Sequence, residues 1–282
     1  MSDRVTCLWD WKKWGAFVGV DYRLQLGRYA RCPYLYDKVT QQMTLKPEVE
    51  YGVVAWIGEE GVQAKLVLNQ EELKEAGQVH VEASHLALYA SRIDQQNGWK
   101  GHVPQRYEHP LKPGVFLWSV TEVNKYALAK EGLLGWYHKK GVEGVLELVK
   151  AHHFEHAYTP EDYAESVTVE HVLKVLEEKK LRPTDLRDKA GEQGRTYHKL
   201  AMFFLQGKNI DLTQAPKWQT DFVSKFAMWC TRVALEPLAV EQTVYEEEPN
   251  PMAGTLDALA SVKREWVEQE WERLHQKQEA KA

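Results

Sequence analysis

The sequence contains few cysteines and no long apolar run. Only three cysteines occur in 282 residues, Cys7, Cys32 and Cys230, and their scattered positions exclude a disulfide framework and a four-cysteine metal site. No segment reaches the roughly 18 apolar residues of a membrane span, and the first residues lack the apolar core of a signal peptide. We therefore expect reduced cysteines in a cytoplasmic protein without a membrane partner.

Positive charge is also scarce overall. The 36 Lys and Arg residues are outnumbered by 41 Asp and Glu, and the net charge of −5 argues against a polybasic coat for nucleic acids. A local basic groove is still compatible with this balance, because electrostatic steering depends on how charge is distributed. Eleven Trp and 13 Tyr favour large buried anchors or stacking surfaces. The length suits one large or two modest domains.

The pattern of apolar residues and turn signals divides the chain near residue 110. Residues 1–110 are predicted to form a small α+β module whose role the sequence does not indicate. Its expected elements are a hairpin of residues 51–57 and 62–68, a helix that Asn69 caps with Glu72 three positions on, a strand at residues 79–83, and a loop over residues 94–113.

Residues 111–282 are predicted to be mainly helical until a short sheet near the end. Ser119 and Glu122 have the spacing of a capping box, and Gly207 is a typical helix stop. Helices are expected at residues 119–130, 134–149, 168–180, 183–205 and 220–233, with a final amphipathic helix that carries Trp266, Val267, Trp271 and Leu274.

Two carboxylates flank a predicted hairpin near the end of the chain. Glu241 lies early on one candidate strand, and Asp257 follows a short apolar run over residues 252–256. The Pro-rich turn at residues 248–251 separates the two strands and would bring both carboxylates together. Converging oxygen ligands are what a hard cation such as Mg²⁺ requires, so this hairpin is a candidate metal site.

A histidine on the helix over residues 183–205 is a candidate third ligand. Gly194 lies four residues before His198 on the same helix face, which leaves room beside the imidazole for an ion or a substrate backbone. Taken alone, His198 is more simply explained as a partly buried histidine that is hydrogen-bonded to a neighbour. The surrounding basic residues are either a solvated face or phosphate contacts, and the candidate DNA contacts are Lys189, Arg195 and Lys199.

In their order, these motifs resemble the PD-(D/E)XK nuclease superfamily, specifically its RecB-like and phage-exonuclease-like branch. The resemblance covers roughly residues 112–260 and does not account for the first hundred. The matching residues are Ser119-Val-Thr121, Gly132-Leu-Leu-Gly-Trp136, Gly194 to His198, Glu241 and Gly254-Thr-Leu-Asp257.

The resemblance implies a helix-rich α/β (α+β) core of the restriction-endonuclease type with a short mixed sheet. It also implies that His198, Glu241 and Asp257 are the catalytic residues that hold Mg²⁺ or Mn²⁺. The implied function is metal-dependent exonuclease activity on DNA in a phage, repair or recombination setting, with a phage or recombination protein as a further partner.

The family's third strand, which carries Asp/Glu-x-Lys, has no clear counterpart after Asp257. Glu279-Ala-Lys281 matches only in letters, and Glu265, Glu268 and Lys263 are weak substitutes on a charged, helical tail. The alternative is therefore an inactive or truncated homologue that binds DNA or a protein, and a third interpretation is a purely structural protein. An incomplete sheet would leave an open edge, which we expect the tail helix or another chain to cover.

Two further clusters have simpler explanations than a functional site. His152 and His156 are one helical turn apart and could bind Zn²⁺, but no third ligand is nearby in the sequence, which favours a polar surface turn. Trp9, Trp11 and Trp14 could stack on bases, but packing in a core is the preferred interpretation.

Overall fold

The structure is a computed structural model that describes residues 3–13, 18–96, 105–127, 141, 169–247 and 251–280. The chain forms two compact units, one of Met1–Ala129 with Thr196–Ala282 and one of Lys130–Arg195. The described residues contain seven helices and two mixed sheets, so the expected α+β class is confirmed. None of the helices in these ranges is both long and apolar enough to cross a membrane.

Sheet A has five strands, and the first strand of the chain lies at its centre. Its order is β5-β4-β1-β11-β8, with β1 parallel to β4 and antiparallel to β11. The strands are β1 (Arg4–Lys13), β4 (Tyr51–Gly58), β5 (Gly61–Leu68), β8 (Glu236–Val240) and β11 (Ala258–Lys263). The expectation that the tail helix or another chain would cover an open edge after Asp257 was wrong, because β1 of the same chain pairs with β11.

Sheet B has six strands in the order β3-β2-β9-β10-β7-β6. They are β2 (Tyr34–Asp37), β3 (Gln42–Leu45), β6 (Gln105–Glu108), β7 (Phe116–Ser119), β9 (Thr243–Glu246) and β10 (Met252–Thr255). β9 and β10 pair antiparallel, as predicted for the hairpin around the Pro-rich turn. The chain passes from β8 into β9 and returns from β10 into β11, so Glu241 and Asp257 lie at the two crossings between the sheets and not on strands.

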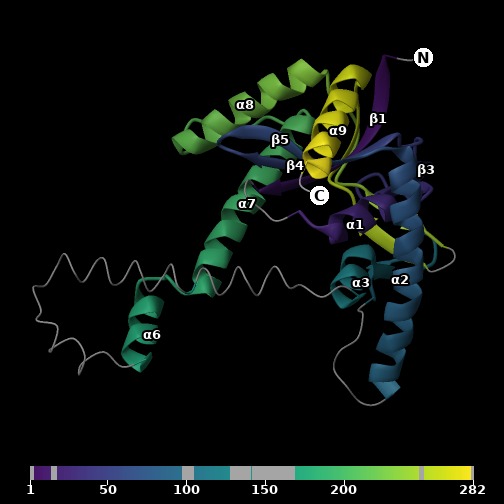
Figure 1. The fold of residues 1–282 in the computed structure, drawn as a ribbon, viewed down its shortest axis with the longest axis horizontal. Helices are drawn as coiled ribbons and strands as arrows, with labels where there is room; N and C mark the ends of the chain where they lie inside the picture. Colours follow the sequence, from purple (N-terminus) through teal and green to yellow (C-terminus); the bar gives the residue numbers. More distant parts are fainter. Residues whose placement is uncertain are drawn as a thin grey trace, which may run out of the picture. The chain divides into compact units, whose positions relative to one another are not determined.

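Helices cover both faces of sheet A (Figure 1). α7 (Pro183–Leu205), through its last three turns, α8 (Lys217–Val233) and α9 (Arg264–Glu279) pack on one face. α1 (Val20–Arg31), α2 (Gln70–Gln96) and α3 (Val120–Ala127) pack between the other face and sheet B. α6 (Val169–Glu178) belongs to the second unit.

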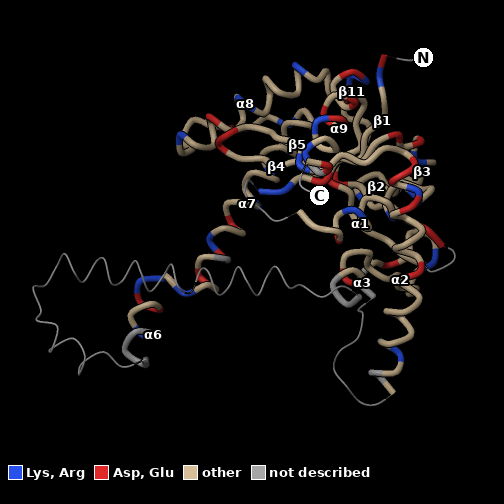
Figure 2. The backbone as a smooth tube through the Cα atoms, in the orientation of Figure 1, with Lys and Arg blue, Asp and Glu red and all other residues tan. Residues whose placement is uncertain are grey.

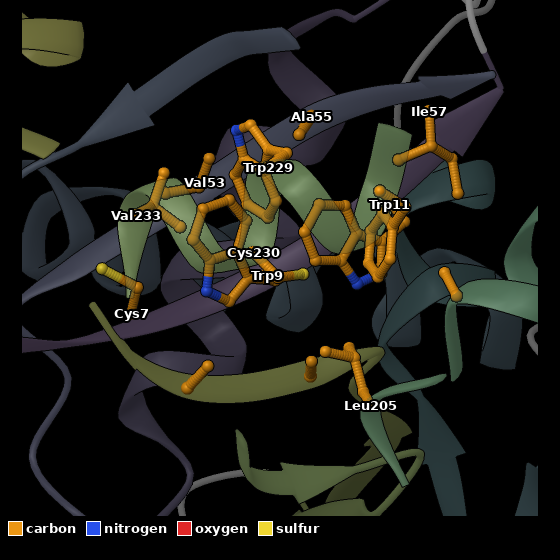
Figure 3. Packing of buried hydrophobic residues seen from close by; sticks show 14 of the residues in the cluster. Cys7, Trp9, Trp11, Val53, Ala55, Ile57, Leu205, Trp229, Cys230 and Val233 are labelled. Atoms are coloured by element: carbon orange, nitrogen blue, oxygen red, sulfur yellow. The ribbon is translucent and has the colours of Figure 1, made fainter. Parts of the chain in front are cut away.

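Tryptophan rings dominate the core under α8 (Figure 3). Trp9 and Trp11 are 1% and 3% exposed and stack with their ring centroids 4.9 Å apart, and Trp229 meets Trp9 edge-on at 5.4 Å. The core interpretation of Trp9 and Trp11 is confirmed, and Trp14 lies outside the described residues. Because side chains alternate along a strand, Asp10 and Lys12 point to the opposite face of sheet A.

Local capping signals located the helices well. The Glu72 amide donates to Asn69 Oδ1 and the Asn69 amide donates to Glu72 Oε2, both at 2.9 Å, which is a reciprocal cap for α2. α2 then continues through residues 79–83, so the strand predicted there was wrong. Residues 94–113 are only partly a loop, because they include the end of α2 and all of β6.

The predicted division near residue 110 does not separate two folding units. Both sheets combine strands from before and after this position, since β1, β4 and β5 pair in one sheet with β8 and β11. α3, α6, α7 and α8 correspond to predicted helices. The helix predicted at residues 134–149 and the pair His152 and His156 lie outside the described residues. All three cysteines are free and buried.

Candidate functional site

The three predicted site residues lie together. His198 Nε2 on α7 is 3.0 Å from Asp257 Oδ1, and His198 Nδ1 is 3.8 Å from Glu241 Oε1. All three belong to the unit that contains both sheets. His198 thus lies between the carboxylates of Glu241 and Asp257, which are located where the chain passes from one sheet to the other.

Backbone contacts fix the two crossings against each other. The Glu241 amide donates to the Asp257 carbonyl and the Leu256 amide donates to the Gln242 carbonyl, both at 3.0 Å. Glu241 has a φ of 53°, a left-handed conformation that costs a non-glycine residue free energy. Gly254 has a different constraint, because a Cβ there would lie 2.3 Å from the ring of Tyr29. The crossings are therefore held tightly, with strain at Glu241.

Asp10 and Lys12 on β1 also belong to this site, although the sequence analysis did not predict them. The Trp11 amide donates to Asp257 Oδ2 at 2.7 Å, and Lys12 Nζ is 2.7 Å from Asp10 Oδ1. The Lys12 ammonium also lies 4.8 Å from the ring centroid of Tyr22 on α1. The sequence pattern that could have identified them is the mainly apolar segment of residues 5–9, which leads into Asp10-Trp-Lys12. This segment is at the start of the chain, whereas the motif was expected after Asp257.

The neighbouring carboxyls of Asp10, which is buried, and Asp257, which is partly exposed, differ in pKa. Burial raises the pKa of Asp10 to about 7; Lys12 opposes this rise, and the neighbouring Asp257 adds to it. Burial would also raise the pKa of Asp257, but the hydrogen bond and charge of His198 lower it overall, with help from Lys12. Two like charges this close are expected to titrate apart.

Neighbouring carboxylates raise the pKa of both cationic side chains of the site, His198 and Lys12. Burial lowers the pKa of His198, but the hydrogen bond and charge of Asp257, with the charge of Glu241, raise it overall. Burial likewise lowers the pKa of Lys12, and Asp10 and Asp257 together raise it above its usual value. Lys12 therefore remains charged, and the carboxylates favour the charged form of His198.

The donor atoms suit a hard divalent cation. Asp10 Oδ2 is buried, and no group in the described part of the chain hydrogen-bonds to it. Together with Asp257 and Glu241 it offers the oxygen ligands that Mg²⁺ or Mn²⁺ takes. As the described side chains stand, no three His, Cys, Asp or Glu residues are arranged to hold an ion. His198 contacts Asp257 directly, and an ion would have to separate the two.

The other predicted residues belong to the second unit or have local partners. Lys189 and Arg195 are exposed residues of the Lys130–Arg195 unit, and Lys199 is exposed with its ammonium 5.4 Å from the ring of Phe203. Arg182 pairs with Glu177 and Asp185, and acidic and basic residues alternate along α7 (Figure 2). The substitutes considered for the missing motif lie at the far end of β11 from Asp257 or on α9, namely Lys263, Glu265, Glu268 and Glu279. Lys281 lies outside the described residues.

Comparisons of the chain with models of protein families, with curated proteins and with solved structures each found no match.

Replacing Glu241 by Gly should stabilise the fold while changing the site. Gly adopts the left-handed conformation without strain, so we expect the free energy of unfolding to rise by about 1 kcal/mol. The pKa of His198 should fall, because the Glu241 charge that raises it is removed. Urea unfolding and an NMR titration of the His198 imidazole measure the two effects.

Ala234, which has a φ of 50° at the end of α8, offers the matched control. Ala234→Gly should give a similar gain in stability with no change in the pKa of His198. An unchanged pKa of His198 in Glu241→Gly would contradict the electrostatic role of Glu241.

Proposed function

We propose that this protein is a metal-dependent nuclease that hydrolyses phosphodiester bonds of DNA, acting as an exonuclease. One observation carries the proposal: β1 presents Asp10 and Lys12 against Asp257, beside His198 and Glu241. Paired carboxylates with an adjacent ammonium form a site for a divalent cation and for the anionic transition state of phosphoryl transfer.

The placement of β1 also supports the resemblance to the PD-(D/E)XK superfamily. That family needs a strand with Asp/Glu-x-Lys beside the strand that follows the aspartate. Here β1 pairs with β11 in the register Trp9 to Ala258, which puts the Asp10-Trp-Lys12 segment alongside Asp257. The proposed motifs therefore occur in a rearranged order, with the third strand first in the chain.

Each side chain of the site has a proposed role. Asp10 and Asp257, with His198 and Glu241, would hold Mg²⁺ or Mn²⁺. When bound, such an ion supplies Lewis-acid activation and lowers the pKa of a coordinated water. Lys12, which Asp10 and the ring of Tyr22 hold in place, orients the attacking water and stabilises negative charge that develops on the phosphate.

The alternative of an inactive binding module depended on the absence of an Asp-x-Lys strand. The geometry of β1 removes that reason, so the catalytic interpretation is favoured. The phage, repair or recombination setting, the protein partner and the candidate DNA contacts Lys189, Arg195 and Lys199 stay predictions.

The nuclease proposal predicts that Asp10→Asn, Lys12→Ala and Asp257→Asn each slow the release of nucleotides from linear DNA by at least about 100-fold with Mn²⁺. Each change removes a ligand or a charge that acts on the transition state. Lys13→Ala is the matched control, since Lys13 is the next residue of β1 and points to the other face; it should cut at the wild-type rate. Equal rates for Lys12→Ala and Lys13→Ala would refute the role of Lys12.

The pH dependence of metal binding is a separate prediction. Below about pH 7 Asp10 holds a proton, which competes with the ion. For the metal-free protein the raised pKa of Asp10 contributes stability at low pH that is lost as the pH rises through about 7. The increase in Tm that Mn²⁺ produces should therefore grow as the pH rises through 7, and this growth should be absent in Asp10→Asn. A Mn²⁺ effect that is independent of pH in the wild type would contradict this account.

A further inference from the structure

A half-buried tryptophan lies beside the lysine of the proposed nuclease site. β1 and β4 are parallel neighbours whose register pairs Lys12 with Trp56. Paired residues of adjacent strands are about 4.8 Å apart and point to the same face. The residues on either side of Trp56, Ala55 and Ile57, are buried in the tryptophan core on the opposite face. Trp56 therefore shares a face of sheet A with Asp10 and Lys12.

A β-bulge in the neighbouring strand aims Lys65 at the indole of Trp56. In the pairing of β4 with β5, Val54 lies opposite Leu66 and Ala55 lies opposite Ala64, so Lys65 is the extra residue of the bulge. Its ammonium lies 3.7 Å from the centroid of the Trp56 ring. Bulges redirect side chains and are common next to active sites. The bulge thus creates a cation–π pair one strand away from Lys12.

Positive charge accumulates around this pair. Burial lowers the pKa of Lys65, and Arg273 and Lys277 of α9 lower it further because their charges have the same sign. Arg273 is anchored to this edge, since its guanidinium donates to the Ala64 carbonyl at 3.3 Å. Arg273 is also ion-paired with Glu270, but Lys65 and Lys277 add positive charge beside the aromatic ring, which favours an anionic ligand with a flat face.

We propose that Trp56 and Lys65 form a subsite for one nucleotide of a single strand that enters the Lys12 site. The base stacks on the indole face that Lys65 now covers, and the Lys65 ammonium moves to the neighbouring phosphate. A base within a duplex is already stacked on both faces, so the subsite selects single-stranded ends. This inference rests on the proposed nuclease function and adds its substrate class.

Binding of a fluorescein-labelled oligothymidylate of about 16 nucleotides, measured by anisotropy in EDTA, tests the subsite without turnover. Trp56→Leu should weaken binding about 5- to 100-fold, and Trp56→Phe should weaken it less because it keeps an aromatic face. Lys65→Gln should weaken binding and also lower the salt dependence by about one phosphate contact. Trp56→Leu should leave the salt dependence unchanged, which a general loss of folding would not do.

Tyr107 and Lys38 provide the matched control, because they form a cation–π pair at 5.7 Å in the region of sheet B. Tyr107→Leu and Lys38→Gln should bind the oligonucleotide like the wild type. Wild-type binding by Trp56→Leu, in a protein that still degrades DNA with Mn²⁺, would overturn the subsite alone. If the wild type neither binds the oligonucleotide nor degrades DNA, both the subsite and the nuclease function fail.

Discussion

Two carboxylates from opposite ends of the chain, the buried Asp10 and the partly exposed Asp257, lie beside each other, and β1 holds them there. The amide of Trp11 donates to Asp257 Oδ2, which holds Asp257 beside the neighbouring Asp10. In the described part of the chain, Lys12 pairs with Asp10 and His198 pairs with Asp257. The rise in the pKa of Asp10 follows from this arrangement.

The rest of the fold serves to keep this arrangement fixed. The tryptophan core locks β1 from one side through Trp9 and Trp11, which leaves the alternate residues Asp10 and Lys12 on the other side. The amide of Glu241, whose backbone is strained, donates to the Asp257 carbonyl, so the two crossings are joined directly. α7 is tied down next to His198, since the Tyr197 hydroxyl donates to Glu59 in the turn between β4 and β5 at 3.2 Å. The site thus depends on packing from several distant segments.

Features set by local chemistry could be predicted from the sequence. Near neighbours in the chain determine the Asn69 cap, the β4–β5 hairpin and the helix over residues 183–205. The proximity of His198, Glu241 and Asp257 was predicted from the order of the motifs that resemble the PD-(D/E)XK superfamily. The pairing of β1 with β11 could not be predicted in this way, because it joins residues about 250 positions apart and no local signal encodes which strand takes an edge. The strand predicted at residues 79–83 failed for the reverse reason: a short alternating stretch lies inside a long helix.

The proposal that Asp10 and Asp257 hold a divalent ion can be tested by a crystal structure with Mn²⁺, in which anomalous scattering locates the ion. We expect one ion coordinated by Asp10 and Asp257, with Lys12 next to it. His198 should then no longer contact Asp257 directly. A well-ordered site with no anomalous peak at saturating Mn²⁺, or an ion bound without either carboxylate, would contradict it.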